Sequence, residues 1–174
     1  MSRELESYSA TLVTHRTKLS FAEATSRLEK HLGVSPGLVS RLPKAANEDE
    51  FTSMIESTTL DKDFLLFTKV RHHDWMRLFS DTRTAPNTAL YTIGNPLIAR
   101  KIFQQDVRAA CAVPIRLLLT EGQGGTDLVY HLPSSLLPQS IHSRSLFKEL
   151  DAKLESLILK VLQNNTSCQY KTKL

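Results

Sequence analysis

Cysteine and long apolar runs are what this sequence most clearly lacks. Cys111 and Cys168 are its two cysteines among 174 residues, and its opening segment, MSRELESYSATLV, has no apolar core of the length that a secretory leader needs. No stretch approaches the roughly 18 consecutive apolar residues of a membrane span. We therefore expect free thiols, a cytoplasmic location and no membrane partner. A chain of this length can bury enough surface to fold without disulfides or metal ions.

A strong charge of one sign is also missing. The net charge is +4 with a pI of about 9.1, and the basic residues are scattered beside apolar ones. Scattered basic residues are typical of a solvated surface, whereas a nucleic-acid face gathers them on one side. A nucleic-acid partner is therefore not favoured, and weak nucleic-acid binding stays a second alternative that depends on the pI alone.

Motifs of familiar catalytic and nucleotide sites are absent as well. The chain contains no GxGxxG, no Walker lysine motif and no Gly-x-Ser-x-Gly elbow. The glycines at 122–125 fit a hairpin turn better than a phosphate loop. The sequence thus indicates no cofactor, and no reaction can be read from it.

The first third of the chain begins with a strand and a helix. Residues 9–17 are rich in β-branched types, which predicts a short strand. Ser20 is followed three positions later by Glu23, the pattern of a capping box. Apolar residues then recur at helical spacing, so we predict a helix over 21–32.

A second helical segment follows. Two prolines interrupt residues 34–46, where they disfavour a helix. Asn47 and Glu50 form another capping box, which predicts a short helix over about 48–58. We interpret residues 34–60 as a helical insertion that covers an edge or a face of the core.

The rest of the chain alternates strands and helices. In order, we predict a strand over 63–70, a helix over 74–80 capped by Asp74, a strand over 89–93, a helix from Pro96 to about 105, and hairpin strands over 114–120 and 127–131. The last helix begins at Ser143 or Ser145, and its apolar stripe runs to Leu162. A stripe of that length must be buried against a sheet or a partner.

These elements predict an α+β fold. We expect a two-layer single domain over 9–165, with a mainly antiparallel sheet and helices packed on one face. Residues 1–8 and 166–174 are polar and predicted to be flexible. The second sheet face then needs a cover, and a second copy of the chain would make a two-fold homodimer.

One ordered set of motifs resembles the domain of unknown function 302 family. Gly94-Asn95-Pro96 is followed by an apolar helix, by Val113-Pro114-Ile115-Arg116 and by a hairpin that ends in Tyr130. Members of that family have a strand ending in Gly-Asn-Pro, a short helix, and a loop into Leu-Pro-Leu-Arg or Leu-Pro-Leu-Lys before a hairpin.

A second segment adds to the resemblance. The residues from Phe67 to His72 resemble the family's strand ending in Asp-His, with His72 at the His position and Arg71 in place of the Asp. The resemblance covers about residues 9–135. It implies a compact α+β fold, often dimeric, and implies no activity.

The polar residues in and beside these motifs are the candidate site. His72 is the candidate acid/base, and the candidate ligand-binding residues are Lys69, Asn95, Arg100, Arg116 and Tyr130. Asn95 stands at a strand-to-helix junction, where its side chain can cap the turn. Alternatively, free N–H groups at that helix start bind an anion, together with Arg100 and Lys101.

Arg116 is open to two interpretations as well. If it faces the core, it needs a carboxylate or an anionic ligand, because an unpaired buried charge is very costly. If it faces water, it is the polar residue of an alternating strand, and its place between Ile115 and Leu117 favours this second interpretation.

Other conspicuous residues have ordinary structural explanations. Cys111 lies among alanines and is expected to be buried and unreactive. Trp75 and Phe79 are expected in the core. His72 and His73 would point to opposite faces of a strand, so no metal site is predicted.

Two hypotheses of different classes follow, besides weak nucleic-acid binding. The first is a homodimer that binds a small molecule, such as a small anionic ligand, or a protein partner. The second is a small cofactor-independent enzyme for an anionic or carbonyl metabolite. In it His72 is the acid/base, and Lys69, Asn95 and Arg116 orient the substrate.

Overall fold

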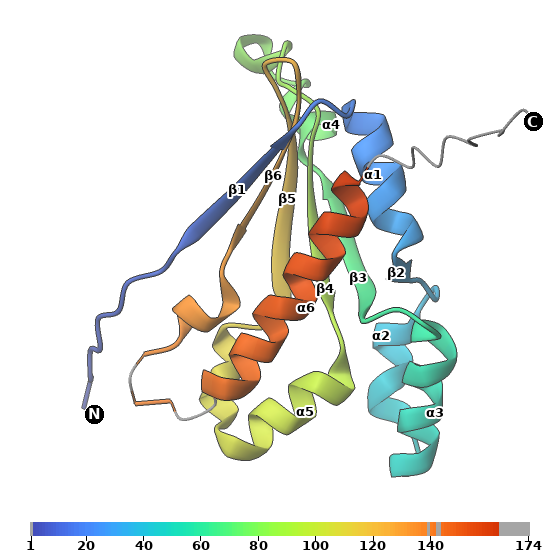
Figure 1. The fold of residues 1–174 in the computed structure, drawn as a ribbon, viewed down its shortest axis with the longest axis vertical. Helices are drawn as coiled ribbons and strands as arrows, with labels where there is room; N and C mark the ends of the chain where they lie inside the picture. The colour runs from blue at the N-terminus through green and yellow to red at the C-terminus, as the bar shows by residue number, and fades with distance from the viewer. Residues whose placement is uncertain (1, 139, 142–143, 164–174) are drawn as a thin grey trace, which may run out of the picture.

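A six-stranded sheet forms the centre of the molecule in a computed structural model that describes residues 2–138, 140–141 and 144–163 (Figure 1). The strands are β1 (Leu12–Thr17), β2 (Leu32–Gly33), β3 (Phe64–Arg71), β4 (Thr88–Gly94), β5 (Ile115–Gly122) and β6 (Gly125–His131). Their order is β1-β6-β5-β4-β3-β2, and every pair is antiparallel except β2 with β3. The predicted antiparallel sheet is confirmed. The short parallel edge strand β2 was not predicted.

Six α-helices accompany the sheet in the described part of the chain. They are α1 (Phe21–Lys30), α2 (Leu38–Arg41), α3 (Glu48–Thr59), α4 (His72–Met76), α5 (Pro96–Gln105) and α6 (Arg144–Leu162). No α-helix runs through both Pro36 and Pro43, because α2 is short and lies between them. The helix predicted over 74–80 begins earlier, at His72, so Asp74 lies inside its first turn and does not cap it.

Three helices begin where a local capping signal places them. The Ser20 Oγ accepts a hydrogen bond from the Glu23 N–H at 3.2 Å, and the Asn47 Oδ1 accepts one from the Glu50 N–H at 2.9 Å. α5 begins with Pro96 at its first position, where the missing N–H costs nothing. These starts depend on residues within four positions of one another, which explains why they were predictable.

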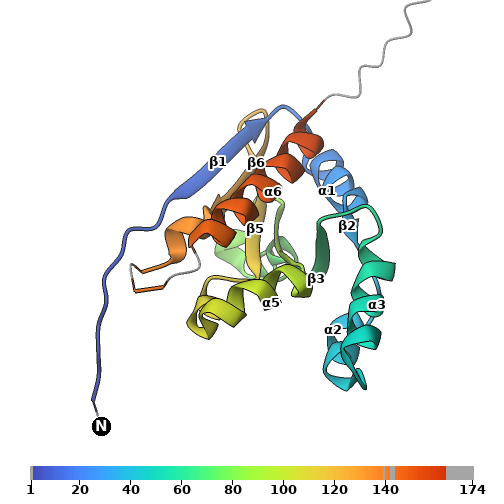
Figure 2. The same cartoon turned by 60° about the horizontal axis from the view of Figure 1, so that its bottom comes forward.

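The main core lies between the sheet and the two helices α1 and α6. Both helices lie on the same side of the sheet in Figures 1 and 2. They bury Leu28, Phe147 and Leu154 against strand residues such as Tyr91 and Leu117. Buried and partly exposed residues alternate along β4 and β5, as expected when helices cover one face of a sheet.

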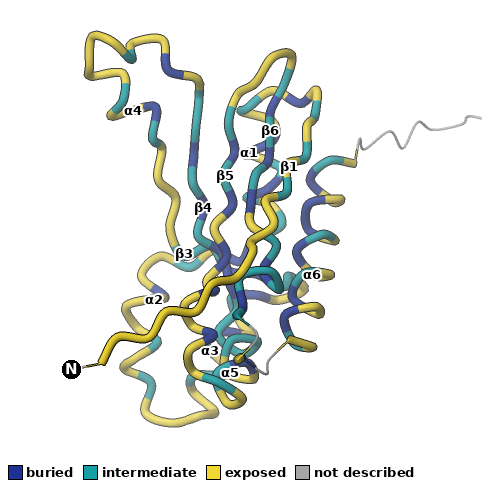
Figure 3. Tube along the Cα trace, turned by 90° about the vertical axis from the view of Figure 1, so that its left-hand side faces the viewer, coloured by how far each residue is buried: buried dark blue, intermediate teal, exposed yellow. Residues whose placement is uncertain are grey.

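The opposite face of the sheet carries a row of partly exposed apolar side chains. Val70, Leu90, Leu118 and Val129 are register partners on four neighbouring strands, and Arg116 is exposed on the same face. The tube in Figure 3 shows how strongly exposure varies along these strands. Within the described residues, α1 and α6 leave this face uncovered.

The predicted insertion at 34–60 forms a second, smaller cluster. Leu38 of α2 and Ile55 of α3 pack with Leu65 of β3 and with partly buried neighbours. α2 and α3 lie beside the β3 edge and next to α5 at the lower end of the molecule (Figures 1 and 2). The segment therefore adds apolar surface near the start of α5.

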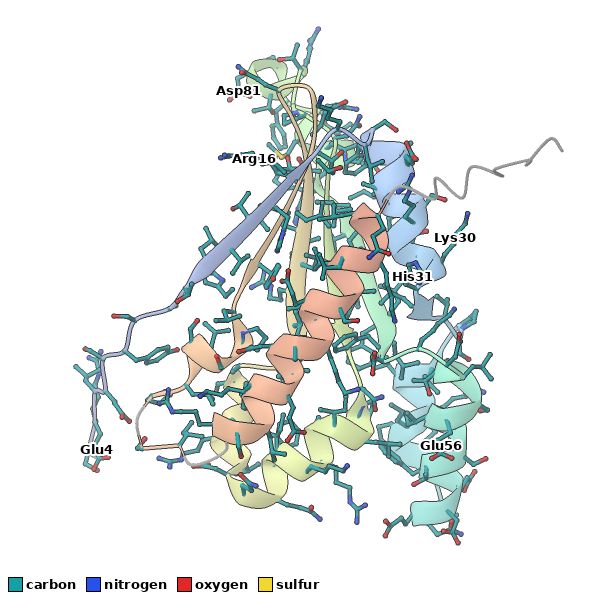
Figure 4. All side chains as sticks on the ribbon, viewed as in Figure 1. Glu4, Arg16, Lys30, His31, Glu56 and Asp81 are labelled. Atoms are coloured by element: carbon teal, nitrogen blue, oxygen red, sulfur yellow. The ribbon has the colours of Figure 1, made fainter. Side chains whose placement is uncertain are left out.

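Trp75 and Phe79 are not in the core, contrary to expectation. Their exposed fractions are 50% and 58%, and that of Leu78 between them is 81%. The connection from β3 to β4 extends past the sheet, and no described element covers these three side chains there. Asp81, labelled in Figure 4, marks this projecting end.

Cys111 also differs from its prediction, because it is exposed. It lies in the short 3-10 helix Val107–Cys111, whose buried side is taken by Ala109, with Ala112 buried just after it. Cys168 and the predicted flexible tail over 166–174 lie outside the described residues. In the described part, no helix combines the length and apolar character required to span a bilayer.

Candidate functional site

An apolar cavity of about 690 Å³ lies where β4 ends and α5 begins. Its apolar walls include Phe51 of α3, Phe67 of β3, and Ile98, Ile102 and Phe103 of α5. Val113, Pro114 and Ile115 close the side formed by the start of β5. The cavity thus lies between the motif Gly94-Asn95-Pro96 and α3.

Gly94 and Asn95 hold this end of β4 in place. A Cβ at Gly94 would lie 2.9 Å from the Phe67 ring, so a larger residue would push that wall aside. The Asn95 Oδ1 accepts a hydrogen bond from the Leu97 N–H at 2.9 Å, and its Nδ2 donates to the Asp63 carbonyl at 3.1 Å. The capping interpretation of Asn95 is confirmed, since both polar atoms of its side chain bond to the backbone.

Among the described residues that line the cavity, Arg100 is the charged one. Its Nη1 lies 2.8 Å from the Glu48 Oε1 of α3, so this ion pair joins α3 to α5. The exposed fractions of the two side chains are 52% and 67%. The other polar lining residues are Asn95 and Gln104. The cavity is therefore an apolar space with one cationic group beside it.

Lys69 belongs to a different cluster, on the face that α1 covers. The Glu29 Oε1 accepts hydrogen bonds from the Lys69 Nζ at 2.6 Å and from the Tyr91 hydroxyl at 2.7 Å. Burial acts to raise the pKa of Glu29, but the bonds from Lys69 and Tyr91 outweigh it and leave that pKa below its usual value. Lys69 is thus occupied by a carboxylate of the protein itself.

Tyr130 is held in a similar way by α6. Its hydroxyl donates to the Glu155 Oε2 at 3.0 Å, and the His15 Nε2 lies 3.3 Å from the same hydroxyl. Burial and the bond to Glu155 raise the pKa of Tyr130. A phenol with a raised pKa is a poor base near neutral pH.

Arg116 lies on the opposite face of the sheet from Lys69 and Tyr130. Lys69 pairs with Tyr91, Tyr91 with Leu117, and Leu117 with Tyr130, so these residues form one row on the helix-covered face. Adjacent strand residues point to opposite faces, which directs Arg116 away from that row. Arg116 is exposed, so the interpretation that it faces water is confirmed.

His72 lies at the far end of β3 from Asn95. Gly94 pairs with Leu65 and Ala89 with Arg71, so the two sites are about 20 Å apart at roughly 3.3 Å per residue. The His72 Nδ1 accepts a hydrogen bond from the Trp75 Nε1 at 3.2 Å. The geometry therefore excludes one site built from His72, Lys69, Asn95 and Arg116 together.

The neighbouring His73 is buried and has a structural environment. Its Nδ1 lies 2.9 Å from the backbone N of Thr88, and its Nε2 lies 3.2 Å from the Asp74 Oδ1. These contacts connect α4 to the start of β4. Among the described residues, no three His, Cys, Asp or Glu side chains converge as metal ligands would.

The apolar walls of the cavity are what the sequence interpretation missed. The sequence of α5 could have indicated these walls, because its apolar residues occupy more than one face of the helix. Leu97 packs toward the smaller cluster with α3, and Ile98 and Phe103 pack toward the main core. A helix with two apolar faces has more such surface than one contact buries. The sequence did not indicate that Phe51 and Phe67 line the same cavity, because they are distant in sequence from α5 and from each other.

The comparisons with known proteins identify the family. A model described as "Domain of unknown function DUF302" matches residues 41–164, well over half of the chain. The chain belongs to this family. The match begins after β1 and α1 and includes α6, whereas the motif resemblance ended near residue 135.

A solved structure supports the same assignment of fold. The crystal structure of an uncharacterized conserved DUF302 protein from Bacillus stearothermophilus is similar to this chain, with a TM-score of 0.61 and 11% sequence identity. The similarity covers 86% of this chain and 97% of the other. At this identity the likeness concerns the fold. No curated protein matches the chain.

Proposed function

We propose that this DUF302 protein binds a small, predominantly apolar molecule in the cavity between β4, α3 and α5. The observation that carries the proposal is the cavity itself, about 690 Å³ with mainly apolar walls. That volume lies within the range of roughly 300–1,000 Å³ that is usual for small-molecule sites. A few polar groups beside an apolar wall are also typical of such sites.

Packing energetics favour an occupant. Protein interiors are close-packed, and side chains that line an empty space lose dispersion contacts on that side. Phe51, Phe67 and Phe103 are only partly buried where they line the cavity. A ligand that covers apolar lining gains roughly 25 cal/mol for each Å² removed from water.

The two alternative functions have weaker support. The enzyme hypothesis needs His72, Lys69, Asn95 and Arg116 to meet in one site. In the structure they lie on different faces and at different ends of the sheet. For nucleic-acid binding, basic side chains would have to face a phosphate backbone. Several of them instead pair with carboxylates, as in Arg16–Asp127, Arg27–Glu23, Lys69–Glu29, Arg71–Asp74 and Arg108–Asp106.

Filling the cavity tests the proposal directly. Ala99 is a partly buried cavity residue of α5, and Ala99→Phe places a ring in the space that a ligand would occupy. The neutral fluorophore N-phenyl-1-naphthylamine serves as the apolar probe. We expect wild-type protein to enhance and blue-shift its emission, and Ala99→Phe to weaken its binding by about ten-fold or more, since loss of roughly 1.4 kcal/mol has that effect.

Ala152→Phe is the matched control. Ala152 is also helical, but it is exposed on α6 and does not line the cavity. This variant should bind the fluorophore as wild type does. Wild-type protein without any fluorescence enhancement, or equal loss of binding in both variants, would remove the basis of the proposal.

We also propose that a second copy covers the open face of the sheet. The support is the row of partly exposed Leu90, Leu118 and Val129, because an apolar sheet face of this kind is usually covered. A cytoplasmic location is proposed too. The exposed free thiol of Cys111 supports it, since such thiols stay reduced there.

A further inference from the structure

We infer that the cavity takes an amphiphile whose headgroup is a single carboxylate, and that this carboxylate pairs with Arg100. The inference rests on the proposed function, because it concerns the same cavity. It adds the chemical class of the ligand: an apolar body against the aromatic and aliphatic walls, and one negative charge beside α5.

The polarity of the lining determines the sign of the headgroup. Among the described lining residues, three are polar: Asn95, Arg100 and Gln104. Asn95 is committed to the Leu97 N–H and the Asp63 carbonyl. Gln104 is uncharged, so Arg100 supplies the charge on the lining. A cationic headgroup would be repelled there, and a neutral one would gain little from it.

Arg100 is placed at the boundary between the cavity and solvent. It follows Pro96 by four positions, so both residues share one face of α5, and both line the cavity. On α3, Glu48 precedes Phe51 by three positions and shares its face. The Arg100–Glu48 pair therefore spans the space between α3 and α5, beside the cavity wall formed by Phe51.

The Arg100 side chain is half exposed, so a ligand can reach its guanidinium. A guanidinium has five N–H donors and binds a carboxylate through two of them at once. The ion pair with Glu48 is made through Nη1, at 2.8 Å from the Glu48 Oε1. Exposed ion pairs contribute little to stability, so a second carboxylate can share or replace this contact at little cost.

The Glu48 carboxylate is also stabilised when Arg100 does not pair with it. It opens α3 together with Asp49 and Glu50, where the positive end of the helix dipole stabilises carboxylates. Release of Arg100 to a ligand therefore leaves Glu48 in solvent at the start of a helix. The pair can open without burying an unpaired charge.

Displacement of N-phenyl-1-naphthylamine by three ligands of equal chain length tests the inference. Decanoate, decan-1-ol and decylammonium share the apolar tail and differ in charge. We expect decanoate to displace the fluorophore at roughly five-fold lower concentration than decan-1-ol, because a partly exposed charge pair contributes up to about 1 kcal/mol. Decylammonium should be the weakest of the three.

Two variants test whether Arg100 and Glu48 cause the preference for decanoate. Arg100→Gln should bring the displacing concentration of decanoate to that of decan-1-ol, because the glutamine carries no charge to pair with the carboxylate. Glu48→Gln should strengthen decanoate binding, because it removes both a competitor for Arg100 and a like charge. Lys101→Gln is the control, since Lys101 is exposed and does not line the cavity.

Each result is decisive. If neither the fluorophore nor the decyl ligands bind, the proposed function fails. If they bind but decanoate has no advantage, or if decylammonium binds best, the cavity remains a binding site and the carboxylate inference is overturned. Equal loss of decanoate preference in Arg100→Gln and Lys101→Gln would assign it to general surface charge, which also overturns the inference.

A second copy of the chain is the remaining occupant to distinguish. If Ala99→Phe or Arg100→Gln changes the molar mass in solution, the cavity is an interface between copies. That result also overturns the inference.

Discussion

Two buried tyrosines show how single residues connect the helices to the sheet. Tyr91 and Tyr130 belong to the same row of the sheet, and each donates its hydroxyl proton to a glutamate of a covering helix, Glu29 of α1 or Glu155 of α6. Burial is the largest cause that raises the pKa of Tyr91, and the bond to Glu29 adds to it. Both phenols therefore stay neutral in the folded protein at pH values where a free tyrosine ionises.

The raised pKa values predict instability in alkali. Below the usual tyrosine pKa of 10.0, both states are protonated and the stability is fully present. As the pH rises above that value, the unfolded chain releases these protons and the folded chain keeps them. The free energy of unfolding should then fall by at most about 1.4 kcal/mol per pH unit for each tyrosine.

Urea denaturation from pH 8 to pH 11 measures this effect. A Tyr91→Phe/Tyr130→Phe double variant should be less stable at pH 8, by roughly 1 kcal/mol for each lost hydrogen bond. Its stability should decline less steeply above pH 10, because two ionising groups are removed. Parallel declines in the two proteins would contradict the burial of these phenols. Tyr8, which is exposed, provides a control through Tyr8→Phe.

At the scale of elements, β1 and the hairpin of β5 and β6 meet at a glycine. A Cβ at Gly125 would lie 1.8 Å from the carbonyl oxygen of Thr17, which is the last residue of β1. At Gly122 the nearest atoms are those of the Asp127 side chain, at 3.5 Å, an ordinary contact. Two glycines in one turn thus differ in how closely another strand approaches them.

The substitutions Gly125→Ala and Gly122→Ala should therefore have very different effects on the free energy of unfolding. Gly125→Ala places a Cβ against the backbone of Thr17 and should displace the end of β1. We expect it to lower the free energy of unfolding by several kcal/mol or to prevent folding. Gly122→Ala should change the free energy of unfolding by less than about 1 kcal/mol. Thermal unfolding followed by circular dichroism compares them. A Gly125→Ala protein as stable as wild type would show that β1 does not approach the hairpin this closely.

At the scale of the molecule, α1 and α6 cover one face of the sheet and the proposed second copy covers the other. Such a dimer would bury the row at Leu90, Leu118 and Val129. The interface would lie on the face of Arg116, away from the tyrosine row of the helix-covered face. The cavity opens elsewhere, at the end of β4, so ligand binding and assembly can be examined separately.

Light scattering coupled to size exclusion tests the second copy. We expect wild-type protein to have about twice the 19.6 kDa mass of one chain. Leu118→Lys should give a monomer with an unchanged circular dichroism spectrum, because a lysine in an apolar interface is strongly unfavourable. Ser156→Lys, on the exposed side of α6, should leave the dimer intact. A monomeric wild type would refute the dimer.

The sequence alone determined the local structure and the arrangement of layers. Ser20, Asn47 and Pro96 mark helix starts because each acts on backbone within a few residues, and the alternation around Arg116 depends only on the two-residue period of a strand. The tertiary structure decided what depends on residues far apart in the chain. It placed Phe51, Phe67 and α5 around one cavity, set Arg100 opposite Glu48, and left Trp75 and Cys111 exposed. Capping and periodicity are short-range effects, whereas a cavity exists only after separate elements have packed, and no local pattern specifies the space between them.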